Sequence, residues 1–190
     1  MSTRRTRTWV VGWLLILPVL GCGGGGGSSG SSSTSPILTS GPVTAIGSVV
    51  VNGIRFEDSA ADIAGDDTPK TLGDIPGIGA MLRIRGRLND DGRSGIADRI
   101  EIENELRGAI VSIAPPDTFT VLGQTVVTDG TTTFEDTTGV LGSDPLVVSD
   151  VVEVHGERDA SGRIRATRVE RMGVPGEDEL RGTITAKTGA

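Results

Sequence analysis

The sequence predicts an all-β protein made of small antiparallel β-barrels in tandem, and three observations support this prediction. Between residues 41 and 180 the apolar residues are mostly Val, Ile and Leu, and in several segments they alternate with polar residues. That alternation is the period of a half-buried strand. Short turn signals built on Gly, Asn and Asp separate the segments. Segments of similar sequence also recur in a constant order, which indicates an internal repeat.

The first element along the chain is a secretory signal. Three arginines precede an apolar run, and a small residue precedes the only cysteine; these are Arg4, Arg5, Arg7, the run Trp9 to Leu20, Gly21 and Cys22. A basic start, a short apolar run and a small residue before the cut are typical of an export signal over residues 1–21. The run is shorter than the roughly 20 residues that a membrane-spanning helix needs.

The end of the signal resembles the lipobox of bacterial lipoproteins, which is cut before a cysteine whose thiol is then acylated. The resemblance implies lipid attachment at Cys22, and Gly23 in place of an aspartate after it favours the outer membrane. The alternative is an ordinary secretory signal that leaves Cys22 as a free thiol. Residues 22–40 are rich in Gly and Ser, a composition typical of a flexible tether. Their glycines follow a signal and not a strand, so no phosphate-binding role is expected.

The repeat divides the rest of the chain into units of 41–106 and 107–180. Similar strand openings stand at 41–46, 108–113 and 182–186, and similar alternating segments at 82–86 and 152–156. An Asp/Gly turn and an Ala-x-Arg-aliphatic-Glu segment follow in both units, at 97–101 and 166–170. Residues 181–190 are either a strand that completes the second barrel or the beginning of a third repeat.

Each unit is expected to hold five or six short strands, closed into a barrel that leaves no exposed edge. Asn52-Gly53 between apolar residues predicts a tight hairpin, and Leu122-Gly123 occupies the same place in the second unit. Alternating strands are predicted over Met81 to Arg87 and Val151 to Glu157. Ser59 to Ala64 is the one segment with a weak helical signal, inside a stretch, 60–79, that looks like an insertion in the first unit.

These segments together resemble a known family. Gly-x-Ile-x-x-Ile, an aliphatic-Asn-Gly hairpin, and an alternating strand that returns through Ala-x-Arg-aliphatic-Glu are similar to the domain of unknown function DUF5666. The resemblance covers roughly 41–180 and is closer in the second unit. It implies OB-like small barrels of the kind found in tandem in exported bacterial proteins, often lipoproteins. It implies no catalytic pattern.

Composition narrows the possible partners. Without the three signal arginines, 15 basic and 25 acidic residues remain, which argues against nucleic acid and against anionic membrane surfaces. Both Trp residues lie in the signal, there is no Tyr and only three Phe are present, so stacking platforms for bases or sugars are nearly absent.

Few residues could carry chemistry, and no catalytic, cofactor-binding or metal-binding residue is predicted. His155 is the only histidine, and Arg85 at the matching place in the first unit predicts that it faces solvent. No second His or Cys exists to share a zinc ion. Acidic clusters at 66–67, 89–91 and 177–179 offer the oxygen ligands of calcium, although turn formation explains Asn, Asp and Gly there as well.

The sequence therefore predicts an exported, lipid-anchored and non-enzymatic binding or scaffolding module of the cell envelope, on the outer membrane and facing the periplasm or the surface. Its expected contacts are the membrane, through the lipid on Cys22, and envelope proteins or polysaccharides; no cofactor is expected. A calcium- or glycan-binding surface domain is the first alternative. An envelope hydrolase with His155 as its base is the second.

Overall fold

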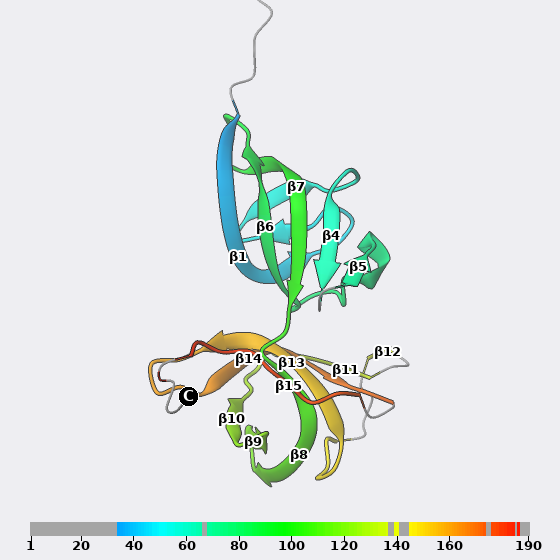
Figure 1. Ribbon diagram of the computed structural model, residues 1–190, viewed down its shortest axis with the longest axis vertical. Coiled ribbons are helices and arrows are strands. Elements are labelled where there is room, and N and C mark those ends of the chain that lie inside the picture. Colours follow the sequence, from blue (N-terminus) through cyan, green and yellow to red (C-terminus); the bar gives the residue numbers. More distant parts are fainter. Residues whose placement is uncertain are drawn as a thin grey trace, which may run out of the picture. The chain divides into compact units, whose positions relative to one another are not determined.

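The structure is a computed structural model that describes residues 34–65, 68–136, 139–140, 145–173, 176–184 and 186. Figure 1 shows that strands form nearly all of its regular structure. The single helical element in these ranges is a 3-10 turn, η1 (Leu72–Asp74), and no described helix is long and apolar enough to cross a membrane. The all-β prediction is confirmed. The predictions for the signal, for Cys22 and for Asp66-Asp67 lie outside the described residues.

The first barrel closes through five strands. They are β1 (Ser35–Ala45), β2 (Val50–Val51), β3 (Ile54–Glu57), β6 (Met81–Leu88) and β7 (Ser94–Glu103). Their order in the sheet is β3-β2-β1-β6-β7, and a further pairing of β3 with β7 closes the ring. The closing pair is parallel whereas the other four pairs are antiparallel, so the expected antiparallel barrel contains one parallel seam. This is a five-stranded Greek-key barrel of the OB kind.

The segment predicted to hold a helical turn is a strand instead. In the first barrel β4 (Asp62–Gly65) pairs in parallel with β7, and β5 (Thr68–Lys70) pairs with β4. Ser59 to Ala64 is therefore wrongly predicted, because pairing with a distant strand outweighs a weak local preference for helix. The same stretch was expected to be an insertion, yet the second barrel carries a matching pair, β11 (Thr133–Asp136) and β12 (Gly139–Val140).

The second barrel repeats this strand order. It consists of β8 (Leu106–Ala114), β9 (Thr118–Val121), β10 (Gln124–Val127), β13 (Val151–Arg158) and β14 (Ile164–Arg171), closed by a parallel pairing of β10 with β14. A short strand, β15 (Glu179–Leu180), lies beside the beginning of β8. Residues 182–184 form no strand, so both interpretations of 181–190 stay open.

The first barrel begins earlier than predicted. β1 starts at Ser35, and its first six residues pair with β6, for example Ile37 with Gly86. Residues 35–40 therefore belong to the barrel and not to the tether. Their Ser and Thr content concealed the strand, because the outer face of β1 is exposed to water.

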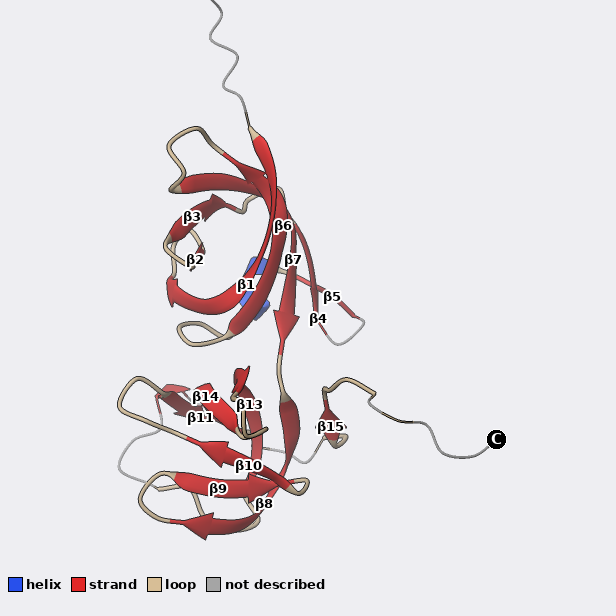
Figure 2. Cartoon of the chain, turned by 90° about the vertical axis from the view of Figure 1, so that its left-hand side faces the viewer, coloured by secondary structure: helices blue, strands red, loops and turns tan. Residues whose placement is uncertain are grey.

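Figure 2 shows the strands of the two barrels. Each barrel has its own apolar core. Phe56, Leu82 and Ile100 are among the buried side chains of the first, and Phe119, Val154 and Ile164 are among those of the second. The predicted hairpins are confirmed: Asn52 and Gly53 join β2 to β3 with φ of 52° and 75°, and the turn after β9 has Leu122 at 49°. Two successive left-handed residues match the twist of the paired strands.

A glycine bulge bends the central hairpin of each barrel. The register of β6 and β7 shifts after Arg85, at Gly86, and that of β13 and β14 shifts after His155, at Gly156. A Cβ atom on Gly86 would lie 2.0 Å from the Ile96 carbonyl oxygen, and one on Gly156 would lie 2.3 Å from the Arg165 carbonyl oxygen. Only glycine therefore fits at either bulge.

We predict that Gly156→Ala lowers the free energy of unfolding by about 1–3 kcal/mol or more, because the added methyl group meets backbone that cannot move aside. Chemical denaturation followed by circular dichroism measures the change. Gly130→Ala is the matched control, since nothing lies within 4 Å of its Cβ position. That variant should stay within about 0.5 kcal/mol of the parent. Equal stability of the two variants would contradict the role given to the bulge.

Candidate functional site

His155 is buried, with 0% of its surface exposed, so the prediction that it faces solvent is wrong. Arg85, which stands before the bulge of the first barrel as His155 does in the second, is exposed. The two positions differ because part of the first barrel covers the outer face of β13 and β14. No local pattern in the sequence predicts that this face of β13 and β14 is covered.

The covering segment is residues 77–81, which we call the first-barrel loop. Its carbonyl groups accept hydrogen bonds from two side chains of β14: Thr167 Oγ1 donates to the Gly79 oxygen at 2.6 Å, and Arg168 Nη1 donates to the Ile78 oxygen at 3.3 Å. Gly79 has φ of 84°, and a Cβ atom there would lie 2.4 Å from the Thr167 carbonyl oxygen. The contact therefore requires glycine both for its backbone conformation and for the space around it.

The ring of His155 links the two barrels through its Nδ1 atom. This nitrogen lies 2.6 Å from the carbonyl oxygen of Glu103 and 3.3 Å from the amide nitrogen of Met81. A carbonyl oxygen only accepts, so the shorter contact places the ring proton on Nδ1. On the opposite side, Nε2 lies 3.2 Å from Glu153 Oε1, at ion-pair distance but without hydrogen-bond geometry.

Glu153 and Arg168 hold opposite charges in this interior. Burial alone raises the pKa of Glu153, but His155 and Arg107 outweigh it, so that pKa is lowered and the carboxylate stays ionised. Arg168 is 1% exposed and pairs with Glu135 at 2.6 Å and with Glu170 at 3.2 Å. Burial lowers its pKa, yet these two carboxylates raise it by more. A buried charge needs such partners, because an unpaired one would be strongly destabilising.

A second polar cluster lies beside this contact, around a pocket of about 430 Å³. Glu103 accepts from Arg83 at 2.9 Å and from Arg181 at 3.0 Å, while Arg158 Nε lies 3.1 Å from Glu105. Burial raises the pKa of Glu105 despite the nearby arginines. Glu103 and Glu105 are thus engaged by arginines, and the Ser40 hydroxyl in the same lining donates to Glu103 Oε2 at 3.2 Å.

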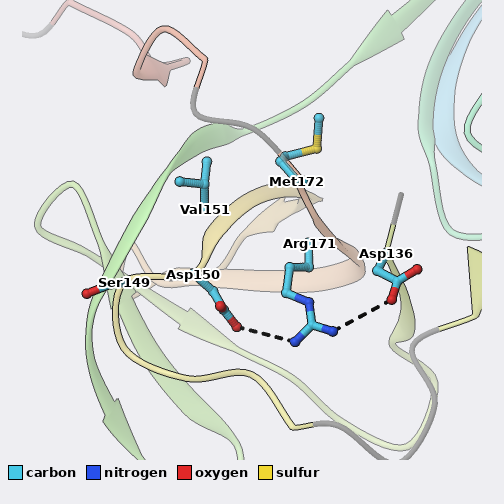
Figure 3. A pocket seen from close by; sticks show the side chains of 7 residues that line it. Asp136, Ser149, Asp150, Val151, Arg171 and Met172 are labelled. Carbon is cyan, nitrogen blue, oxygen red and sulfur yellow. Dashed lines mark ion pairs between the residues drawn. The ribbon is translucent and has the colours of Figure 1, made fainter. Parts of the chain in front are cut away.

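In the second barrel, an open pocket of about 410 Å³ lies beside the ends of β11 and β14 (Figure 3). Asp136, Ser149, Asp150, Arg171 and Met172 are among its lining residues. The guanidinium of Arg171 lies between two carboxylates, 3.6 Å from Asp136 and 3.7 Å from Asp150. Sequence reasoning did not single out these residues, because they come from three separate strands and loops.

The acidic turns proposed as calcium ligands use their oxygens locally. Asp91 Oδ1 accepts from the Arg93 and Ser94 amides, both at 2.8 Å, and Asp91 Oδ2 accepts from the Ser94 hydroxyl. These bonds lower the pKa of Asp91. In the last acidic cluster, Glu179 accepts from Asn104 at 3.1 Å. Among the described residues, no three acidic, His or Cys side chains are grouped to hold a metal ion.

Residues 107–170 match the family model named Domain of unknown function (DUF5666). The match spans the five strands of the second barrel, so the predicted resemblance is confirmed for this part of the chain. No curated protein and no solved structure matches the chain. The family description names a domain and no activity, so function has to be argued from the residues themselves.

We predict that Gly79→Ala uncouples the two barrels whereas Gly77→Ala does not. Both glycines have positive φ, at 84° and 116°, so both variants strain the backbone in a comparable way. Only at Gly79 does the new methyl group meet the Thr167 carbonyl; at Gly77 the nearest atom is 3.7 Å away.

Denaturant unfolding followed by circular dichroism measures this coupling. We expect the Gly79→Ala transition to separate into two steps, one for each barrel, and the Gly77→Ala transition to remain single with a lower midpoint. Two steps in both variants would show that backbone strain and not the docking contact is responsible.

Proposed function

We propose that this chain is an exported, lipid-anchored and non-enzymatic module that binds or scaffolds other components of the bacterial cell envelope, through tandem DUF5666 barrels. The basic and apolar start, the Gly21-Cys22 junction and the Gly/Ser segment favour export and anchoring. The lipid on Cys22 would hold the barrels at the outer membrane, within reach of envelope proteins and polysaccharides.

The observation that most favours a scaffolding role is the use of the chain's single histidine in a structural contact. His155, the only histidine, is fully buried and its Nδ1 atom bonds the first barrel. A general base has to reach the substrate proton, so His155 in this position favours assembly over hydrolysis. Arg168, its cross-strand neighbour, pairs with two carboxylates and donates to the first barrel, as expected for a docking contact between domains.

A calcium- or glycan-binding surface domain is the second candidate, favoured by the acidic turns and by the acidic pocket of the second barrel. Bound calcium at about 100 times its dissociation constant would add roughly 2.7 kcal/mol to stability. Thermal melting with calcium and with EDTA therefore separates the two proposals. A calcium-dependent rise in midpoint would favour this candidate, and an unchanged midpoint would favour scaffolding.

We predict that Cys22→Ala abolishes membrane attachment. Expressed in a Gram-negative host and fed a labelled fatty acid, the parent chain should carry the label and sediment with the outer membrane. The Cys22→Ala chain should carry no label and appear in the soluble fraction. Ser28→Ala in the Gly/Ser segment is the matched control and should behave like the parent. A labelled or membrane-bound Cys22→Ala chain would contradict the lipid anchor.

A further inference from the structure

The first-barrel loop is held in shape by a pair of backbone hydrogen bonds to β1. The Gly79 amide donates to the Val43 oxygen at 2.9 Å, and the Val43 amide donates to the Ala80 oxygen at 2.9 Å. Gly79 adopts φ of 84°. Ala80 packs in the first barrel's own core with 0% of its surface exposed, Met81 is 6% exposed, and Ile78 is 48% exposed.

The second barrel has a loop of the same conformation, residues 147–151, which we call the second-barrel loop. The Ser149 amide donates to the Ile110 oxygen at 2.9 Å, and the Ile110 amide donates to the Asp150 oxygen at 2.8 Å. Ser149 adopts φ of 81°, nearly the value of Gly79. A serine seldom adopts this left-handed conformation, so the preserved loop geometry is a feature of the fold and not of its local sequence.

This second loop is uncovered. Val147 and Val148 are 52% and 53% exposed, and the open pocket around Arg171 lies next to them along the chain (Figure 3). In the first barrel the matching loop contacts β14 through its Ile78 and Gly79 carbonyl groups, and Gly79 is buried there, while the Ile78 side chain stays 48% exposed. The second barrel thus exposes the end that the first barrel uses for docking.

The face that receives a loop is also present twice. In the second barrel it is the cross-strand pair His155 and Arg168, covered by the first-barrel loop. In the first barrel the pair at the same point of the register is Arg85, which is exposed, and Arg99, which is half-buried. Leu38 of β1 is paired with Arg85 and is 63% exposed. We call Leu38, Arg85 and Arg99 the first-barrel face.

The first-barrel face carries unbalanced charge. Arg99 pairs with Asp62 and Glu101, but Arg85 has no ion pair with any described side chain. Two like charges directly opposite each other on a sheet destabilise it. The second-barrel loop offers an opposite charge in Asp150, which lies 3.7 Å from Arg171, and two exposed valines to cover Leu38.

We propose that the second-barrel loop of one copy of this chain docks on the first-barrel face of a second copy. This association repeats between chains the contact that joins the barrels within a chain. It deepens the proposed scaffolding function by naming a partner, and it does not depend on the lipid. A head-to-tail contact uses two different surfaces, so it continues into open arrays unless the rotation closes a ring.

Ser149 sets the strength of this contact. Inside the chain, a Cβ atom on Gly79 would lie 2.4 Å from the Thr167 carbonyl. Ser149 has that Cβ atom, so two copies cannot approach as closely as the two barrels do. The association is therefore weaker than the internal contact and depends on concentration, as suits chains gathered on a membrane.

The test is sedimentation velocity of a soluble chain without residues 1–31, the part that lies outside the compact unit Ser32–Ala190. We expect the sedimentation coefficient to rise with concentration between about 10 µM and 1 mM. Arg85→Glu on the face and Val148→Arg on the loop should each abolish the rise, the second because it sets a further cation against Arg85 and Arg99. Arg55→Glu on β3 and Val111→Arg on β8 are the controls with the same changes at other exposed positions, and should associate like the parent.

Mixing the two interface variants distinguishes a head-to-tail contact from any symmetric one. The Arg85→Glu chain keeps its loop and the Val148→Arg chain keeps its face, so the mixture should form one-to-one dimers and nothing larger. Ser149→Gly should lower the dissociation constant of the otherwise unchanged chain by about tenfold, since it removes the crowded methylene group. Circular dichroism confirms that every variant is folded.

Three results would overturn the proposal. One is a parent chain that stays monomeric over the whole range, another is association that survives Arg85→Glu, and the third is a variant mixture that stays monomeric. The truncated chain lacks Cys22, so a negative sedimentation result would not bear on the proposed lipid attachment. Loss of attachment in the labelling experiment likewise leaves self-association untouched, so the two proposals fail separately.

Discussion

The cohesion of the two barrels depends on backbone carbonyl groups of the first barrel that contact an arginine and a histidine of the second. Domains of this size bury too little surface to be more than marginally stable alone. The Ile78 and Gly79 carbonyls of the first-barrel loop accept from Arg168 and Thr167, and the Glu103 carbonyl at the end of β7 accepts from His155. Without this contact, one charged and two polar groups would lose these partners, and the buried Arg168 and His155 side chains would face water.

This dependence explains which parts of the structure could be predicted from the sequence. The hairpin at Asn52-Gly53 and the strand over Met81 to Arg87 were predicted correctly, because turn chemistry and alternation are local properties. β4 was missed because its strand conformation comes from pairing with Arg99 to Ile102 of β7, far along the chain. The predicted start of the first barrel was too late, because the serine and threonine residues on the solvent-exposed face of β1 resemble a flexible tether.

The functional interpretation was harder to reach for the same reason. The register that puts Arg85 and His155 at matching points was visible in the sequence, but which of the two is covered was not. Gly79 was the available signal: a glycine that has to approach another backbone closely. A single sequence does not separate such a glycine from Gly77 two residues before it, whose space is open.

Two loops of the same backbone conformation therefore have different surroundings, because within the chain only the first-barrel loop meets a face of the other barrel. The second-barrel loop carries the same backbone hydrogen bonds, with Ser149 and Asp150 in place of the buried Gly79 and Ala80. In repeat proteins each unit contacts its neighbours. The proposed association extends that rule between chains, since the arginines of the first barrel would receive the second-barrel loop of another copy.

The most direct measurement is an NMR test of the contact between the single histidine and the first barrel. Its ring protons are unique in the chain, so a nuclear Overhauser effect between the His155 ring and the Met81 amide can be assigned without ambiguity. The docking account predicts this effect, together with a ring Nδ1 proton that exchanges slowly with water. A ring that contacts only the residues of its own barrel, and whose proton exchanges freely, would contradict it.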